Sequence, residues 1–370
     1  MNTWISTVLF ILHRSSFILF SGAMSQYLRP NIRAMTGYTP GEQPQGDGII
    51  KLNTNENPYP PSPRALEAMA EILRSDRLRK YPDPLGTAFR KSAGKLFGVD
   101  PDGILIGNGS DDVLTILTRA FVPEGGLVVS PMPSYLLYAT LAAIQGASFE
   151  GVPFTRDWQL PAPWPKTDAH LTLVANPNSP TGTMVSNAAL EGLSKELRGV
   201  LVVDEAYVDF ADTHAIQLTR LPNVIVTRTL SKSYSLAGLR FGFALGAPAL
   251  VRELIKVKDS YNCDALSLAG AQAALEDQDY LRQTQAKIVV TRTRMTKELR
   301  TLGFDVLPSH ANFVWATRTD RAVKPIFEEL KQRKILVRYM NYAGHGDGLR
   351  ISVGSEPEID RLLEELKKLV

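Results

Sequence analysis

Three of the apolar segments that the sequence predicts as buried strands end in polar residues of different chemical kinds. The segment LTLVA leads into Asn176, LVV leads into Asp204 and Tyr207, and VIVTRTL leads into Lys232. Because ligands of open α/β sheets bind at the carboxyl ends of strands, we expect these four side chains to converge on one ligand. An amide, a carboxylate, a phenol and an amine together suit a charged ring that carries an aldehyde.

A pyridoxal ring requires a group of each of these kinds. Burial disfavours the charged form of a lysine, so the amine of Lys232 is suited to form an imine with an aldehyde. Asp204 beside the pyridine nitrogen would keep the ring protonated and electron-withdrawing. Asn176 and Tyr207 would contact the ring oxygen. The alternatives are that Asn176 only makes a turn and that Asp204 caps a helix or forms a surface ion pair.

The phosphate of such a cofactor needs backbone donors at a helix start and a cation. The segment GNGSDDVLTIL predicts a glycine-rich turn that opens an apolar helix at Ser110 and Asp111. Ser231, Ser233 and Arg240 flank Lys232 closely enough in sequence to complete an anion-binding cup.

The elements that must position these residues alternate along the chain. Short β-branched runs follow one another between helical segments, which predicts an α/β layered sheet, mostly parallel and covered by helices. A first helix is expected after Ser62, with Ser62 as its cap and Pro63 at its first position. After about Ser260, a long charged helix and four strand-like runs predict a second, smaller α+β domain.

Composition excludes several classes of protein. Hydrophobic residues make up 44% and charged residues 21% of the 370 residues, which is typical of a folded globular chain. The net charge is only +3 and no long basic run is present, so we expect small-molecule substrates and no nucleic-acid partner. With Cys263 as the single cysteine and five scattered histidines, we expect no disulfide, no metal site and a cytoplasmic location.

The first 24 residues form an apolar extension to which the sequence assigns no role. His13 and Arg14 divide it into runs that are too short to span a membrane, so we expect no membrane partner. Met24, which begins MSQYLRPNIR, is a possible start of the biological chain.

Larger segments resemble a known family. NPNSPTG, DEAYVDF and TLSKSYSLAGLRFGF are similar to the signature segments of class I and II aminotransferases, which belong to the pyridoxal-phosphate fold type I superfamily. KLNTNENPYPPSP, GNGSDDVL, ILVRYM and GLRISVG resemble, more narrowly, the histidinol-phosphate aminotransferases. The similarity extends from about Ser25 to Val370. It implies α/β fold type I, in which helices sandwich a mostly parallel seven-stranded sheet beside a smaller α+β domain.

The resemblance also implies domain bounds and residue roles. Residues 25–60 would form an arm, 61–262 the cofactor-binding domain and 263–370 the small domain, with 1–24 outside the family pattern. Lys232 would hold pyridoxal 5'-phosphate covalently, and Tyr135 would stack on its ring. The homodimer would share its active sites, with Tyr59 reaching across from the second subunit. The residues implied for the phosphate are Ser110, Asp111, Ser231 and Arg240, and those implied for the ring are Asn176, Asp204 and Tyr207.

Two late arginines lie in strand-like runs without a neighbouring carboxylate. Arg338 in ILVRYM and Arg350 in GLRISVG would therefore bind an anionic part of the substrate, since a planar guanidinium suits phosphate and carboxylate alike. Tyr38 would add a hydroxyl from the arm.

The activity that the resemblance implies is transamination between L-histidinol phosphate and 2-oxoglutarate, a step of histidine biosynthesis. An aminotransferase for aromatic amino acids and a decarboxylase for a phosphorylated amino acid would use the same cofactor residues. A transcription regulator built on this fold would need a DNA-binding domain ahead of the arm, where the sequence has only a short apolar stretch.

Overall fold

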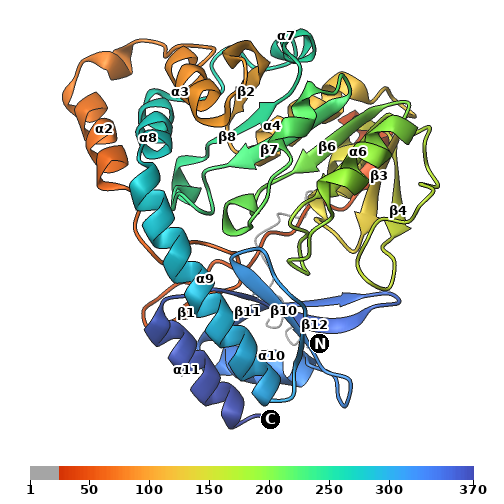
Figure 1. Ribbon diagram of the computed structural model, residues 1–370, viewed down its shortest axis with the longest axis vertical. Coiled ribbons are helices and arrows are strands. Elements are labelled where there is room, and N and C mark those ends of the chain that lie inside the picture. Colours follow the sequence, from red (N-terminus) through yellow and green to blue (C-terminus); the bar gives the residue numbers. More distant parts are fainter. Residues whose placement is uncertain (1–24) are drawn as a thin grey trace, which may run out of the picture.

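The computed structural model describes residues 25–370 and places them in two β-sheets with helices around them (Figure 1). Residues 1–24, the predicted apolar extension that ends at Met24, lie outside the described residues. The larger sheet occupies the upper part of Figure 1 and the smaller sheet the lower part, and helix α9 (Gln278–Thr301) runs from one to the other. Within residues 25–370, no helix is both long and apolar enough to cross a bilayer.

The larger sheet has seven strands, of which only β8 runs against the others. In order across the sheet they are β2 (Ile104–Gly107), β8 (Gly242–Leu245), β7 (Val224–Thr229), β6 (Val200–Asp204), β5 (Leu171–Ala175), β3 (Leu127–Met132) and β4 (Ser148–Pro153). The predicted α/β fold with a mostly parallel seven-stranded sheet is confirmed.

Helices cover both faces of this sheet. Side chains of a strand point alternately to opposite faces, so Leu201 and Val203 of β6 pack in one hydrophobic cluster and Val202 packs in another. The covering helices are α2 (Pro63–Arg74), α3 (Thr87–Phe97), α4 (Ser110–Phe121), α5 (Leu137–Gln145), α6 (Asn187–Glu196), α7 (Pro248–Ile255) and α8 (Ala265–Glu276). The short α1 (Pro30–Ala34) lies against α5. As predicted, α2 begins after Ser62, whose Oγ accepts a hydrogen bond from the backbone of Arg64.

The smaller sheet contains a strand from the N-terminal arm. Its order is β1 (Ile50–Leu52), β11 (Ile335–Tyr342), β12 (Gly346–Ser352), β10 (Phe313–Thr317) and β9 (Asp305–Val306). Strand β1 pairs in parallel with β11, and the other neighbours are antiparallel. Helices α9, α10 (Lys324–Gln332) and α11 (Glu356–Lys367) complete a separate hydrophobic core. The arm therefore crosses to the small sheet before the large sheet begins.

The boundary between the two parts follows from the composition of the two cores. Cys263, α8 and Leu281 at the start of α9 belong to a core of the larger sheet, whereas Ile288, further along α9, belongs to that of the smaller sheet. We predicted a boundary between 262 and 263. The packing of α9 favours a boundary later in the sequence. We propose that this boundary lies within α9, between Leu281 and Ile288.

Candidate active site

The three strand ends that carry the predicted site residues are neighbours. Strands β7, β6 and β5 lie side by side and parallel, so their carboxyl ends open at one edge of the sheet. A cleft of about 280 Å³ lies there, and residues of the arm and of the small sheet close its other side. The predicted site residues that line it are Tyr38, Ser110, Asp111, Tyr135, Asp204, Tyr207, Ser231, Lys232, Arg240, Arg338 and Arg350.

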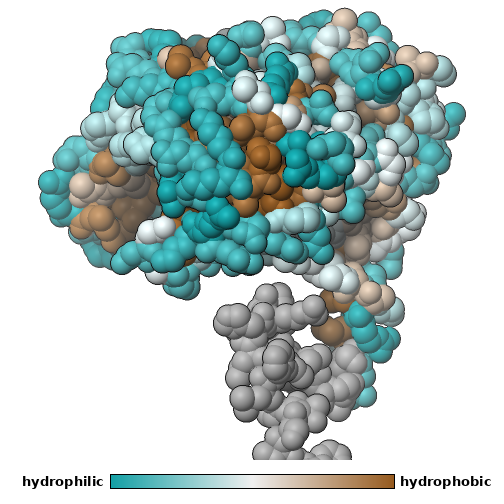
Figure 2. Space-filling model, turned by 90° about the horizontal axis from the view of Figure 1, so that it is seen from below, coloured by the Kyte–Doolittle hydropathy of each residue, from teal (hydrophilic) through white to brown (hydrophobic). Residues whose placement is uncertain are grey.

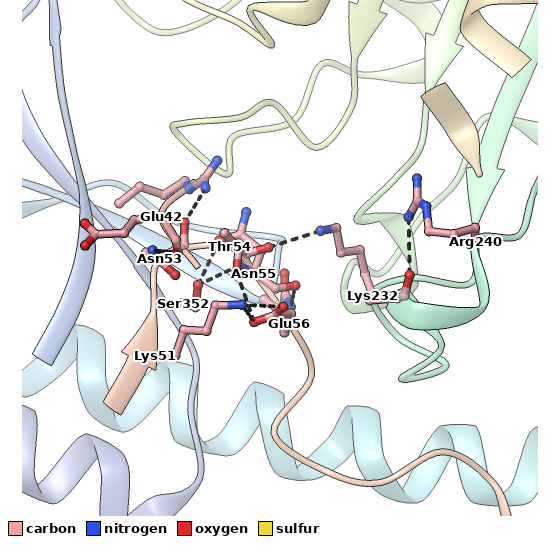
Figure 3. Close-up of polar contacts among 12 residues, drawn as sticks. Glu42, Lys51, Asn53, Thr54, Asn55, Glu56, Lys232, Arg240 and Ser352 are labelled. Carbon is pink, nitrogen blue, oxygen red and sulfur yellow. Dashed lines mark hydrogen bonds and ion pairs between the residues drawn. The ribbon is translucent and has the colours of Figure 1, made fainter. Parts of the chain in front are cut away.

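Lys232 follows β7 and points toward the arm (Figure 3). Its Nζ donates a hydrogen bond to the carbonyl oxygen of Thr54 at 3.2 Å and lies 5.7 Å from the centre of the Tyr207 ring. The amide of Asn57 donates to the carbonyl oxygens of Lys232 and Ser233, which fixes the turn that carries the lysine. Among the described residues no carboxylate pairs with Lys232, so its amine is held in place without an ion pair.

Asp204 is a buried carboxylate at the end of β6. Its side chain accepts hydrogen bonds from the hydroxyls of Tyr138 at 2.7 Å and Thr227 at 3.1 Å. Burial raises the pKa of Asp204 above its ordinary value. No basic side chain within residues 25–370 forms a salt bridge with it, and a buried carboxylate that lacks a cation favours a cationic ligand. A protonated pyridine nitrogen fits this need.

Two tyrosines form walls of the cleft. The hydroxyl of Tyr207 accepts a hydrogen bond from Asn55 at 3.0 Å. The hydroxyl of Tyr135 contacts Asp111 at 3.3 Å, and its ring packs edge-on against Tyr38 at 5.9 Å between centroids. Burial is the main cause that raises the pKa of Tyr135, so this residue stays a neutral aromatic surface. Both placements agree with a flat ring bound between these walls.

The start of α4 forms one side of the predicted anion cup. Gly109 has a φ of 85°, which glycine adopts without strain, and Nη2 of Arg240 lies only 2.5 Å from where a Cβ would stand. Arg240 also lies 3.4 Å from Oγ of Ser231 and 3.6 Å from a carboxylate oxygen of Asp111. A carboxylate cannot donate to a phosphate, so Asp111 would contribute its backbone N–H, as Ser110 would, while its side chain lies beside Arg240.

Arg338 and Arg350 stand directly opposite each other on β11 and β12. Arg350 donates to Oγ of Ser179 at 3.0 Å and to the carbonyl oxygen of Asn53 at 2.9 Å, and its buried Nε has no partner among the described residues. Arg338 donates to the carbonyl oxygens of Thr39 and Pro40 in the arm, both at 3.4 Å. Burial lowers the pKa of Arg350, and Arg338 acts in the same direction. Like charges in register destabilise a sheet, so an anion between them would relieve a repulsion.

Three predicted site residues do not line this cleft: Asn176, Tyr59 and Ser233, whose hydroxyl donates to the carboxylate of Asp209 instead of facing the anion cup. The side chain of Asn176 forms two hydrogen bonds with the backbone of Val185. Its Oδ1 accepts from the N–H of Val185 at 2.8 Å, and its Nδ2 donates to the carbonyl oxygen of Val185 at 3.1 Å. This is the turn-forming role that the sequence left open. Ser179, three residues later, faces the cleft instead, and we propose that it takes the place expected of Asn176. Tyr59 packs on the smaller core with Lys287 above its ring at 5.1 Å, so its contact across subunits stays a prediction.

Sequence reasoning missed most of the residues that hold the site residues in place. They are Asn53, Thr54, Asn55 and Asn57 of the arm, Tyr138, Ser179 and Thr227. Tyr138 lies in the first turn of α5 and its backbone N–H donates to the carbonyl oxygen of Tyr135, three positions earlier, at 3.3 Å, so the spacing of the two tyrosines was a usable signal. The arm residues gave no such signal.

The sheet, the lysine after β7 and the aspartate that ends β6 define an enzyme of the pyridoxal-phosphate fold type I class. A family model described as aminotransferase class I and II matches residues 47–366. The chain therefore belongs to the class I and II aminotransferase family.

Several relatives of this chain have a narrower name in common. The chain is 51% identical to histidinol-phosphate aminotransferase of Rhodopirellula baltica over 90% of its own length and 92% of the relative. It is 47% identical to histidinol-phosphate aminotransferase 1 of Trichormus variabilis over 94% of its own length and all of the relative. The crystal structure of histidinol-phosphate aminotransferase from Sinorhizobium meliloti in complex with pyridoxal-5'-phosphate is similar with a TM-score of 0.83 and 28% identity, covering 93% of this chain and 98% of that one.

Proposed function

We propose that this aminotransferase uses pyridoxal 5'-phosphate to transfer the amino group of L-histidinol phosphate to 2-oxoglutarate, giving imidazole acetol phosphate and glutamate. The names of relatives at 51% and 47% identity support this substrate. The observation that carries the proposal is the pair of opposed arginines at the cleft, Arg338 and Arg350, neither of which forms a salt bridge within residues 25–370. We also propose that the reaction serves histidine biosynthesis and that the enzyme acts in the cytoplasm.

The residues of the cleft fit the cofactor in three ways. The amine of Lys232 would hold it covalently, the carboxylate of Asp204 would meet the ring nitrogen, and the cup at the start of α4 with Arg240 would bind its phosphate. When bound, the cofactor supplies an electron-withdrawing ring that acidifies the substrate carbon bearing the nitrogen. Tyr135 and Tyr207 would fix the plane of that ring.

The two arginines explain how one cleft can accept both substrates. Histidinol phosphate has no carboxylate beside its amine and carries a phosphate ester on the neighbouring carbon. Glutamate has a carboxylate in the corresponding place. A guanidinium presents its N–H groups as a planar fork that binds either oxyanion, so Arg350 can serve in both half-reactions.

Product analysis with purified protein tests the reaction and the substrate together. We expect imidazole acetol phosphate and glutamate from histidinol phosphate and 2-oxoglutarate. Release of carbon dioxide from a phosphorylated amino acid would indicate a decarboxylase. A higher kcat/KM for phenylalanine or tyrosine than for histidinol phosphate would indicate an aminotransferase for aromatic amino acids.

The Arg350→Lys variant is expected to raise KM for both histidinol phosphate and glutamate by about 10-fold or more, because a point charge replaces a fork that forms two hydrogen bonds. Steady-state kinetics with each substrate measures this, and the absorbance of the bound cofactor should not change. A change of absorbance without a change of KM, or opposite changes for the two substrates, would contradict a shared anion pocket.

We also propose that the enzyme is a homodimer. Tyr81 and Tyr261 stack on each other at 4.4 Å between centroids although they are 81% and 48% exposed, and Leu73 on α2 is 59% exposed. The surface in Figure 2 likewise shows hydrophobic patches within a mostly hydrophilic face. Exposed apolar surface of this kind is typical of protein interfaces.

Mixing two inactive variants tests the predicted role of Tyr59 across subunits. A dimer of one Lys232→Ala subunit and one Tyr59→Ala subunit has one site with both native residues. Random pairing is therefore expected to restore about a quarter of wild-type activity. Mixing Lys232→Ala with Asp204→Ala is the control, because both changes then affect residues of the same chain's site and no intact site forms. Heterodimers that stay inactive in the first mixture would contradict a shared site.

A further inference from the structure

One short arm segment, Asn53–Asn57, contacts residues from both sheets at the cleft (Figure 3). The consecutive carbonyl oxygens of Asn53, Thr54 and Asn55 accept hydrogen bonds from side chains that lie far away in the sequence. The donors are Arg350 at 2.9 Å, Lys232 at 3.2 Å and Asn312 at 3.0 Å, respectively. The segment thus ties the lysine after β7 to the arginine on β12.

Asn55 is the most constrained residue of this segment. It is 1% exposed and has a φ of 57°, in the left-handed region that asparagine tolerates better than most residues. Its backbone N–H donates to Oγ of Ser352 at 2.9 Å, and its side-chain amide lies between Ser352 and the hydroxyl of Tyr207. The hydrogen-bonding needs of these two neighbours therefore determine whether the oxygen or the nitrogen of the Asn55 amide faces Tyr207.

Ser352 decides the orientation of that amide. This residue is 2% exposed, and its hydroxyl already accepts the backbone N–H of Asn55, so the hydroxyl proton needs an acceptor. Oδ1 of Asn55, at 3.0 Å, is the acceptor that the described residues offer. If the amide were flipped, the buried Ser352 proton would lose this acceptor. Nδ2 of Asn55 therefore faces Tyr207 and donates to it at 3.0 Å.

A phenol oxygen that accepts a hydrogen bond from an amide must direct its own proton elsewhere. Within residues 25–370 no group accepts the proton of Tyr207, and this tyrosine lines the cleft. We propose that Asn55 is a positioning residue that makes the Tyr207 hydroxyl a donor toward the ring oxygen of the cofactor. This inference rests on the proposed function, in which that oxygen lies beside Tyr207.

A donor at an anionic ring oxygen stabilises the form of the bound cofactor that has lost a proton. Asn55 therefore lowers the pH at which the bound cofactor deprotonates. A change at Asn55 that removes or reverses the direction of the hydrogen bond should raise this pH, whereas a purely structural role in the arm would leave it unchanged.

The test is a pH titration of the visible absorbance of the holoenzyme. Asn55→Asp has nearly the same shape but can only accept from Tyr207, and both this reversal and the added negative charge should raise the midpoint by about one unit or more. The uncharged Asn55→Gly variant described below separates these two causes. Asn187→Asp adds the same charge at the first turn of α6, outside the cleft lining, and should leave the midpoint at the wild-type value. A midpoint in Asn55→Asp equal to that of the wild type would overturn the proposal.

A double-mutant cycle shows whether the effect of Asn55 on the midpoint depends on the Tyr207 hydroxyl. It also replaces the first test if Asn55→Asp does not fold. Asn55→Gly keeps the positive φ without strain, and both this variant and Tyr207→Phe should raise the midpoint. The double variant should match Tyr207→Phe alone, because Asn55 then has no hydroxyl to orient. Additive shifts would overturn the proposal. If the wild type itself shows no pH-dependent cofactor absorbance, or if Lys232→Ala keeps it, the proposed function fails instead.

Discussion

The Lys232→Ala variant is expected to lose the visible absorbance of the covalently held cofactor and to fall below about one-thousandth of wild-type turnover. The reason is that no other lysine among the described residues lines the cleft. The fold should persist, because the amine of Lys232 forms one hydrogen bond, to the carbonyl oxygen of Thr54, and no ion pair with the described residues. Absorbance and multiple-turnover kinetics measure the loss, and circular dichroism checks the fold.

An exposed lysine outside the cleft provides the control. Lys195 on α6 pairs only with Glu191 at the surface, and Lys195→Ala should retain both absorbance and turnover. A Lys232→Ala protein that stays yellow and fully active would remove the basis of the proposed function, whereas a colourless but folded protein supports it.

The large sheet could be predicted because its central strands are buried on both faces. Such strands are continuous β-branched runs, as in VIVTRT of β7, and their polar ends stand out. Strand β4 (SFEGVP) has no such run because it lies at the sheet edge, where Ser, Glu, Gly and Pro are tolerated. Strands were therefore easiest to predict from the sequence where they are most completely buried.

The candidate site was predictable only as far as strand order determines it. Asp204 and Lys232 follow adjacent parallel strands, and topology alone brings them together. Asn176 and Ser179 belong to one turn, and the direction of its backbone decides which side chain faces the cleft. Hydrophobic periodicity carries no information on that direction.

The arm contacts were not predictable for a different reason. Asn55 bonds to Tyr207 and Ser352, which are 152 and 297 positions away in the sequence. These contacts exist because β1 pairs in parallel with β11, and this pairing places a Pro- and Asn-rich segment across the cleft. Local sequence patterns indicated only an extended arm, because Tyr207 and Ser352 belong to elements that are distant from Asn55 in the sequence.

Asp204→Ala and Asp204→Asn are both expected to reduce turnover by at least about 100-fold while some cofactor stays bound. Both variants remove the negative charge that would keep the ring nitrogen protonated, although asparagine keeps nearly the same shape and can still accept from Tyr138 or Thr227. Comparing the two variants therefore separates loss of charge from loss of packing.

The cofactor-free protein provides an independent measurement. Because burial raises the pKa of Asp204 and no basic side chain within residues 25–370 pairs with it, its charge costs folding free energy until a cation binds. The Asp204→Asn apoprotein should therefore melt at a temperature equal to or above that of the wild-type apoprotein, while the holoenzyme should lose most of the stabilisation that cofactor binding gives. A residue that served only to pack β6 would show the opposite order for the apoproteins. Near-normal turnover of the Asn variant would exclude the role at the ring nitrogen.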